Sequence, residues 1–151
     1  MYDNINSVEG CGHSPPRKYI RKENEFIKIE DVLKEENFKV SKDAPKRIEI
    51  QGDMVKVAKS LRLRTFMYKG ITCCKCGIKG SYFVKEKTED QSPWHLNLYA
   101  LNEDGEEVLM TKDHILPKSK GGRDFLDNMQ TMCCICNVKK GNTIEQEDFE
   151  R

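Results

Sequence analysis

The sequence predicts a small single-domain protein of the α+β class. The chain has 151 residues, which is enough for one modest hydrophobic core and short for two. Segments with the alternating apolar pattern of strands occur beside segments with helix start and stop signals, and glycine-containing turns separate them. Two Cys-x-x-Cys pairs, far apart in the chain, suggest that a metal adds the stability that a small core lacks.

The chain divides into four consecutive parts. Residues 1–24 contain glycines, prolines and scattered charges without apolar periodicity, so we expect a flexible arm. Residues 25–70 are expected to form a helix, a hairpin and a basic helix. Residues 71–141 contain both cysteine pairs and form the expected functional core. Residues 142–151 are an acidic tail, which we expect to be solvated.

Local patterns define three elements between residues 25 and 70. Apolar residues among alternating charges over residues 25–38 predict a short amphipathic helix. Alternating apolar residues on both sides of a glycine predict a hairpin over residues 47–57. Ser60 and Gly70 bracket a run that contains arginines and a lysine, as expected for the N-cap and the C-terminal stop of a helix over residues 61–69.

Further strands are predicted in the functional core. A strand begins near Tyr82, and residues 95–101 and 108–111 form a hairpin around an Asp-Gly turn. This hairpin leads the chain to Asp113. Residues 117–127 are too polar and glycine-rich for regular structure, and long loops of this kind are often functional.

Charge is unevenly distributed along a chain whose formal net charge is only +1. Residues 54–88 hold nine basic residues and one acidic residue, whereas residues 89–151 are net acidic. A basic block in a neutral chain is typical of a polyanion-binding face, and the helix over residues 61–69 is its best candidate for contacts with phosphates. The alternative is that the block is simply a solvated helix surface.

Four of the seven cysteines form the predicted zinc site. Cys73 with Cys76, and Cys133 with Cys136, each have the spacing that lets a pair clasp one side of a tetrahedral Zn²⁺. Gly77 suits the tight backbone of such a zinc knuckle. The long gap between the pairs means that the metal would join two distant segments. With four thiolates the coordination shell is closed, so this zinc is expected to be structural and any catalytic metal must lie elsewhere.

The remaining cysteines are expected to be bystanders. Cys74 and Cys134 lie inside the two pairs but have no partner at the same spacing, and Cys11 with His13 lacks a second pair nearby. Cysteines at metal spacing without a signal peptide indicate a reducing compartment, so we expect a cytoplasmic protein. No apolar run approaches the roughly 20 residues that a membrane helix needs, and no membrane association is expected.

Two segments of the functional core resemble the HNH endonuclease family. The sequence T-K-D-H-I-L-P-K-S-K-G-G over residues 111–122 and the sequence N-M-Q-T-M-C-C-I-C-N-V-K-K-G over residues 128–141 are similar to its zinc-stapled subgroup. The resemblance implies a ββα-metal fold, also called the His-Me finger, in which a hairpin and a helix hold one divalent cation. The first strand would end at Asp113 and His114, the second would span residues 129–132, and the helix would start near Cys134.

The resemblance also implies roles for four residues. Asp113 and Asn137 would bind the catalytic metal, His114 would be the general base, and Asn128 would hold the loop and that base in place. Many relatives have histidine where this chain has Asn137, which leaves the metal preference open. Small proteins similar to this one are frequent in bacteriophage genomes, so the expected setting is a bacterial or phage-infected cytoplasm.

The chemistry of these residue types favours the same roles. A histidine, with an ordinary pKa of about 6.5, is a suitable proton acceptor for a water that attacks a phosphodiester near neutral pH. The oxygens of Asp113 and Asn137 suit Mg²⁺ or Mn²⁺ better than zinc. Because adjacent strand residues point to opposite faces, Asp113 and His114 can serve one site only if the strand ends or twists there.

The expected function is metal-dependent hydrolysis of double-stranded DNA, with 5′-phosphate and 3′-hydroxyl products implied by the resemblance. One active site cuts one strand, so a monomer would nick, and a double-strand break would need a homodimer or two binding events. Two alternatives stay open at this point. One is a zinc-stapled module that binds nucleic acid or protein without catalysis, and the other is an RNA nuclease. No base-reading element that would reveal a target sequence stands out.

Other residues near the motif are assigned less specific roles. His95 alternates with polar strand residues, and we expect it to be structural rather than a second base. Four lysines flank the motif and are candidates for contacts with phosphates: Lys118, Lys120, Lys139 and Lys140.

Overall fold

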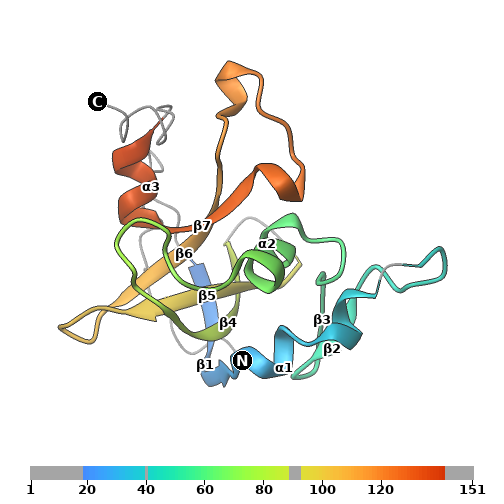
Figure 1. The fold of residues 1–151 in the computed structure, drawn as a ribbon. Coiled ribbons are helices and arrows are strands. Elements are labelled where there is room, and N and C mark those ends of the chain that lie inside the picture. The colour runs from blue at the N-terminus through green and yellow to red at the C-terminus, as the bar shows by residue number, and fades with distance from the viewer. Residues whose placement is uncertain (1–18, 40, 89–92, 142–151) are drawn as a thin grey trace, which may run out of the picture.

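A five-stranded antiparallel sheet lies at the centre of the computed structural model, which describes residues 19–39, 41–88 and 93–141 (Figure 1). The order of the strands across the sheet is β1-β4-β5-β6-β7. Their bounds are β1 Tyr19–Ile27, β4 Gly80–Thr88, β5 His95–Leu101, β6 Glu107–His114 and β7 Met129–Cys133.

Helices and a small hairpin surround this sheet. The α-helices are α1 Ile29–Val32, α2 Leu61–Lys69 and α3 Cys134–Lys140. The hairpin pairs β2 Ile48–Ile50 with β3 Asp53–Val55. Three short 3-10 turns complete the fold: η1 Glu35–Phe38, η2 Lys118–Lys120 and η3 Leu126–Asn128. The prediction of a small α+β domain is thus confirmed, as are the helix over residues 61–69 and both predicted hairpins.

The hydrophobic core lies between one face of the sheet and α2. Leu63 and Phe66 of α2 are buried against Phe83 and Leu98 of the central strands, together with Met132 of β7. Two local signals set the ends of α2. Ser60 caps its N-terminus, because the side-chain oxygen accepts the N–H of Leu63, and Gly70 ends it with a φ of 96°.

Buried polar groups cover the opposite face of the sheet and explain why β1 belongs to it. The Arg21 guanidinium donates to Glu86 at 2.8 Å and to Glu107 at 2.9 Å, and Tyr99 and Asn97 donate to the other oxygen of Glu86. Burial raises the pKa of Glu86, although Arg21 and these donors oppose the shift. A buried carboxylate is tolerated only when it is paired and hydrogen-bonded, and this network supplies those partners.

Two predictions for the N-terminal part are wrong. Residues 19–24 were expected in the flexible arm but belong to β1, which pairs with β4 from Tyr19 to Ile27. The helix expected over residues 25–38 is interrupted: Phe26 continues the strand, and only the four-residue α1 and the turn η1 follow. The ring of Phe26 packs on Tyr82 of β4 at 4.6 Å between centroids, so pairing with a distant strand overrides the local helical pattern.

Some predictions fall outside the described residues, namely most of the N-terminal arm, with Cys11 and His13, and the acidic tail. None of the described helices is long and apolar enough to cross a membrane.

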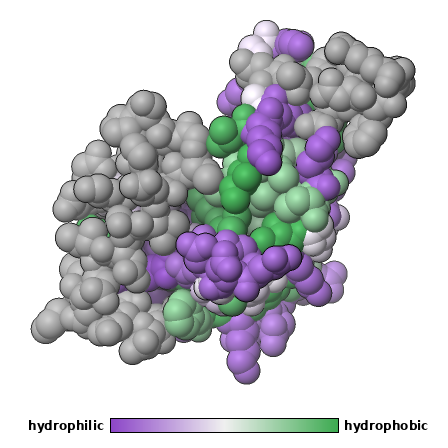
Figure 2. All heavy atoms as spheres, turned by 90° about the vertical axis from the view of Figure 1, so that its left-hand side faces the viewer, coloured by the Kyte–Doolittle hydropathy of each residue, from purple (hydrophilic) through white to green (hydrophobic). Residues whose placement is uncertain are grey.

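Figure 2 views the side on which α3 lies, where hydrophobic side chains reach the surface between hydrophilic ones. Two exposed apolar residues of α3 are Ile135 and Val138.

Candidate functional site

The four predicted zinc ligands are brought together. The sulfur atoms of Cys73, Cys76, Cys133 and Cys136 all lie within 4.8 Å of one another, and Cys76 Sγ is 3.8 Å from Cys133 Sγ. The first pair lies in the turn between α2 and β4, and the second pair spans the junction of β7 and α3. The cluster therefore joins two segments that are distant in sequence.

Backbone geometry positions each cysteine pair. The Sγ of Cys73 accepts the N–H groups of Lys75 and Cys76, and the Sγ of Cys133 accepts the N–H of Cys136 as the N-cap of α3. Gly77 has a φ of 83°, which a glycine adopts without strain, and its N–H donates to the Cys73 carbonyl. These are the tight turns that the Cys-x-x-Cys spacing predicts.

The electrostatics of the cluster fit a dication. Burial alone would raise the pKa of the Cys73 thiol, but hydrogen bonds from backbone N–H groups outweigh it and lower this pKa to about 6. Burial raises the pKa values of Cys133 and Cys136; the neighbouring sulfur atoms raise that of Cys136 further, whereas hydrogen bonds from Cys136 oppose the shift at Cys133. Four thiolates this close would repel one another, so a bound cation is what allows all four to ionise. Tetrahedral sulfur ligands fit zinc.

The ββα arrangement follows directly in the chain. β6 pairs with β7 so that Asp113 lies opposite Gln130 and His114 opposite Met129, and α3 starts immediately after β7. In Figure 1 the loop between β6 and β7 extends away from the sheet, and α3 returns beside β6. The predicted hairpin and helix are confirmed.

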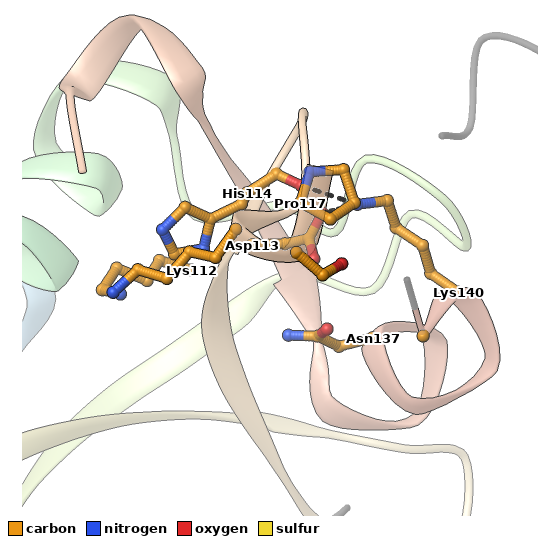
Figure 3. A pocket seen from close by; sticks show the side chains of 9 residues that line it. Lys112, Asp113, His114, Pro117, Asn137 and Lys140 are labelled. Atoms are coloured by element: carbon orange, nitrogen blue, oxygen red, sulfur yellow. Dashed lines mark hydrogen bonds and ion pairs between the residues drawn. The ribbon is translucent and has the colours of Figure 1, made fainter. Parts of the chain in front are cut away.

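An open pocket of about 240 Å³ lies where β6, the loop and α3 meet (Figure 3). Asp113 and His114 both line it, although they alternate along β6. The conflict expected from strand alternation is absent because β6 ends at His114 and the chain turns at Pro117, another wall of the pocket. The complete lining is Lys112, Asp113, His114, Pro117, Lys118, Ser119, Asn137, Lys140 and Gly141.

Asp113 is held by two side chains. Its Oδ2 accepts Gln130 Nε2 at 2.8 Å and lies 2.8 Å from Lys140 Nζ, and the carboxylate is nearly buried. Lys140 is buried as well, and its ammonium also donates to the backbone carbonyl of His114 at 2.6 Å. Lys140 was predicted to be a candidate for phosphate contact, but its ammonium instead braces the end of β6 from α3.

Asn137 presents an oxygen rather than an amide nitrogen. The Thr111 hydroxyl donates its single proton to the Met132 carbonyl at 2.7 Å, so this hydroxyl can only accept from Asn137. The Nδ2 of Asn137 accordingly donates to Thr111 Oγ1 at 2.9 Å. This contact uses the nitrogen of the amide, which leaves the Asn137 carbonyl oxygen as its available ligand atom on the pocket wall.

His114 makes a contact that the sequence pattern did not identify. Its Nε2 lies 2.7 Å from Asp124 Oδ1, and the other oxygen of Asp124 lies 3.2 Å from Lys118 Nζ. Hydrogen bonds from His114 and Lys118 hold the pKa of the Asp124 carboxyl below its usual value. Asp124 and Lys118 both lie in the loop between β6 and β7, so the conformation of this loop determines how the His114 imidazole is held.

Asn128 fastens that loop to itself. Its Oδ1 accepts the N–H of Leu116 at 2.8 Å, and its Nδ2 donates to the carbonyls of Leu116 and Arg123 at 3.1 and 3.0 Å. Gly122 is required in the same loop, because a Cβ there would lie 1.7 Å from the Leu116 carbonyl oxygen. Asn128 therefore sets the loop backbone and reaches His114 only indirectly.

The donor set of the pocket fits a hard divalent cation. Asp113 and Asn137 offer oxygen atoms, and Asp113 uses only Oδ2 in the two contacts described above. Mg²⁺ is usually bound through one or two protein oxygens while it keeps several waters, and an open pocket leaves room for them. Sulfur ligands, which would favour zinc, belong to the separate cluster.

The structure thus gathers three of the four predicted motif residues around one pocket, with Asn128 behind it. The pattern missed Asp124, Gln130 and the inward orientation of Lys140. One signal could have revealed Lys140, because it follows Asn137 by three positions and therefore shares its helix face. Asp124 offered no such signal, since its contact depends on how an irregular loop folds.

Comparison with known proteins agrees with the motif. Residues 102–150 match the HNH endonuclease family, and this segment contains the pocket motif and the second cysteine pair but not the first. No curated protein and no solved structure gave a match. The match covers about a third of the chain. The resemblance predicted from the motif is therefore confirmed: residues 102–150 match the model of the HNH endonuclease family.

Proposed function

We propose that this protein is a metal-dependent endonuclease that hydrolyses phosphodiester bonds in DNA. In this proposal His114 is the general base, and the oxygens of Asp113 and Asn137 hold Mg²⁺ or Mn²⁺. Asn128 shapes the loop that carries the contacts of the base. A separate zinc, bound by the four-cysteine cluster, maintains the fold that places these residues.

One observation carries the proposal, namely that an imidazole and two oxygen ligands line the same open pocket. His114 lies at the end of β6, and Asn137 lies on α3. Helix α3 packs against β6, and β6 pairs with β7, so the pocket is formed by elements that are held together. A family match alone would not show that these side chains share one cavity. Convergence of a candidate base and candidate cation ligands is the arrangement that hydrolysis requires.

The proposed reaction uses this geometry as follows. A water donates a proton to the His114 imidazole as its oxygen attacks phosphorus, and the bond from phosphorus to the 3′-oxygen breaks. The leaving 3′-oxygen takes a proton from solvent, which gives 5′-phosphate and 3′-hydroxyl ends. A bound divalent cation would supply Lewis-acid stabilisation of the charge on the phosphate and the leaving oxygen. Lys140 keeps the strand end in place through Asp113 and the His114 carbonyl.

The charge around the pocket supports a polyanionic substrate. Burial lowers the pKa of Lys112, and the positive charges of Lys118 and Arg62 lower it further, against the opposing effect of Asp124. An anionic phosphate placed among these cations would relieve their mutual repulsion. Arg62 lies on α2, which packs against β6, β7 and η3, so the basic helix borders the site as a phosphate-tracking surface should.

Nucleic acid is the substrate class that the family implies, and double-stranded DNA is the specific proposal. A single pocket acts on one strand at a time, so the monomer is expected to nick. Cleavage of both strands would follow from a homodimer or from successive binding events.

The test is cleavage of a supercoiled plasmid by zinc-loaded protein with added Mg²⁺ or Mn²⁺, compared with His114→Ala. The variant is expected to lose nicking while zinc content and DNA binding stay unchanged. His95→Ala is the matched control, because His95 lies on β5 and packs on the Tyr19 ring at 5.9 Å between centroids. Undiminished nicking by His114→Ala would refute the assigned base.

The same experiment separates the two alternatives. A wild-type protein that shifts DNA on a gel but leaves the plasmid intact with every divalent cation would be a binding module. A matched RNA substrate that is cut faster than its DNA counterpart would make the protein an RNA nuclease.

A further inference from the structure

We propose that Asp124 is a positioning residue for His114: it fixes the tautomer of the imidazole so that Nδ1 is the atom that accepts the proton from water. This inference rests on the proposed function, because it assigns an atom to the base. It also makes a structural statement, the identity of the protonated ring nitrogen, that can be measured without any cleavage.

The two carboxylate oxygens of Asp124 contact different partners. Asp124 Oδ1 lies 2.7 Å from His114 Nε2, a distance typical of a charge-assisted hydrogen bond. Asp124 Oδ2 lies 3.2 Å from Lys118 Nζ. The carboxylate thus bridges the imidazole and an ammonium, and Lys118 restrains it from the side away from the ring.

The chemistry of the carboxylate decides which ring nitrogen carries hydrogen. An ionised carboxylate can only accept hydrogen bonds, and the lowered pKa of Asp124 keeps it ionised near neutral pH. Nε2 must therefore donate, so in the neutral ring the lone pair is on Nδ1. A base whose free nitrogen is fixed in advance needs no tautomer exchange before each turnover.

Two further contacts hold this arrangement together. Asn128 donates to the carbonyl of Arg123, the residue immediately before Asp124, and so fixes the backbone that carries the carboxylate. Lys140 donates to the backbone carbonyl of His114 and holds the other end of the contact. The loop and α3 therefore restrain Asp124 and His114 independently.

A simple surface ion pair is the competing explanation. The side chain of Asp124 is 53% exposed, and exposed pairs contribute little to folding stability. If the contact were only such a pair, its loss would change neither the tautomer nor the turnover number. The two explanations therefore differ in what they predict for the ring nitrogens and for kcat.

The test is nitrogen NMR of zinc-loaded protein labelled with ¹⁵N-histidine, recorded near pH 8, above the ordinary histidine pKa of about 6.5. The chain has three histidines, and His114→Ala assigns the signal of interest. The wild type should show hydrogen on Nε2 of His114. Asp124→Ala should give a mixture of both tautomers. Asp124→Glu, whose carboxylate can still only accept the Nε2–H, should keep the wild-type tautomer.

Cleavage rates of the same proteins complete the test. Asp124→Ala should lower kcat by about 100-fold or more with little change in KM, since a misplaced tautomer removes the base without removing substrate contacts. Asp124→Glu, which keeps an acceptor-only group, should recover part of that loss. Asp127→Asn, a change at an exposed carboxylate on the same loop, should match the wild type.

Hydrogen on Nδ1 in the wild type, or an unchanged tautomer together with an unchanged kcat in Asp124→Ala, would overturn the proposal. If the wild type cuts no nucleic acid, the proposed function fails by itself. The NMR spectra would still decide whether Asp124 fixes the ring.

Discussion

Helix α3 carries parts of two different sites, a closed sulfur cluster at its first turn and an open oxygen-lined pocket one turn further on. Cys133 and Cys136 face the cluster, whereas Asn137 and Lys140 face the pocket. The cluster supplies four ligands of one kind and leaves no position for a substrate. The pocket offers two protein oxygens beside a histidine, and a cation bound there would keep most of its coordination shell as water.

This difference shows how a short helix can serve both stability and chemistry. Four thiolates would bind a structural metal tightly, and that metal would hold α3 against the turn before β4. From α3, Asn137 and Lys140 reach β6, where they contact Thr111 and the His114 carbonyl. In our account the tight site positions the residues, and the weaker site carries out the reaction.

The largest expected effect comes from breaking the sulfur cluster. Cys133→Ser should abolish zinc binding and unfold the domain, because structural zinc contributes about 10–16 kcal/mol whereas whole domains are stable by about 5–15 kcal/mol. Zinc analysis and circular dichroism would measure both effects. Cys74→Ser is the control, since Cys74 is exposed and lies outside the cluster. A folded Cys133→Ser protein without zinc would contradict the structural role.

Removal of the weaker cation should stop the reaction and leave the fold intact. Gel filtration into metal-free buffer is expected to remove a cation held by two oxygens but not one held by four thiolates. Plasmid nicking should then disappear and return when Mg²⁺ or Mn²⁺ is added, while one zinc per chain remains. Full nicking by the desalted protein with zinc alone would show that the reaction does not need a second, weakly bound cation.

A smaller effect is expected from Lys140→Met. The change leaves the buried Asp113 carboxylate without its cation, which typically destabilises a protein by about 3–5 kcal/mol. Added Mg²⁺ should restore part of this loss by supplying positive charge at the same carboxylate, and cleavage should fall by about 10- to 100-fold.

Urea unfolding with and without Mg²⁺ measures the effect of Lys140→Met. Lys139→Met is the matched control, because Lys139 is the exposed neighbour of Lys140 on the same helix. Equal stability of the Lys140 and Lys139 variants would mean that the buried contact with Asp113 has no energetic role.

The smallest effect on stability is expected from Asn128→Ala. Three hydrogen bonds within the loop are lost, and a loss of about 2 kcal/mol follows from about 0.7 kcal/mol for each of these exposed bonds. Hydrogen exchange at the Leu116 amide should accelerate, while zinc content stays the same. Asn128→Asp is the informative companion, since it keeps the acceptor for Leu116 and loses both donors. Unchanged exchange in Asn128→Ala would contradict the loop-holding role.

Most of the fold around the pocket could be predicted because its signals are local. Ser60 and Gly70 mark the ends of α2, and the spacing of Cys73 and Cys76 fixes a knuckle whatever surrounds it. Strand β1 could not be predicted in this way. Its charged sequence is typical of a solvated segment, and its place in the sheet depends on the contact of Arg21 with Glu86, which lies 65 residues further along the chain.

The same division applies to the candidate site. His114 and Asn137 belong to the motif in the sequence, which predicted them as site residues, and both line the pocket. Asp124 could not be identified, because its contact with His114 depends on the path of an irregular loop that Asn128 and Gly122 shape. Residues in regular elements were predictable from spacing, and residues whose contacts depend on the loop were not.

The central claim is that two different metals occupy two different sites, and anomalous X-ray scattering tests it most directly. Crystals of zinc-loaded protein soaked in Mn²⁺ would be measured at the zinc and manganese absorption edges. We expect a zinc peak among the four cysteine sulfurs and a manganese peak beside the oxygens of Asp113 and Asn137. A manganese peak elsewhere, or zinc in both places under these conditions, would contradict the claim.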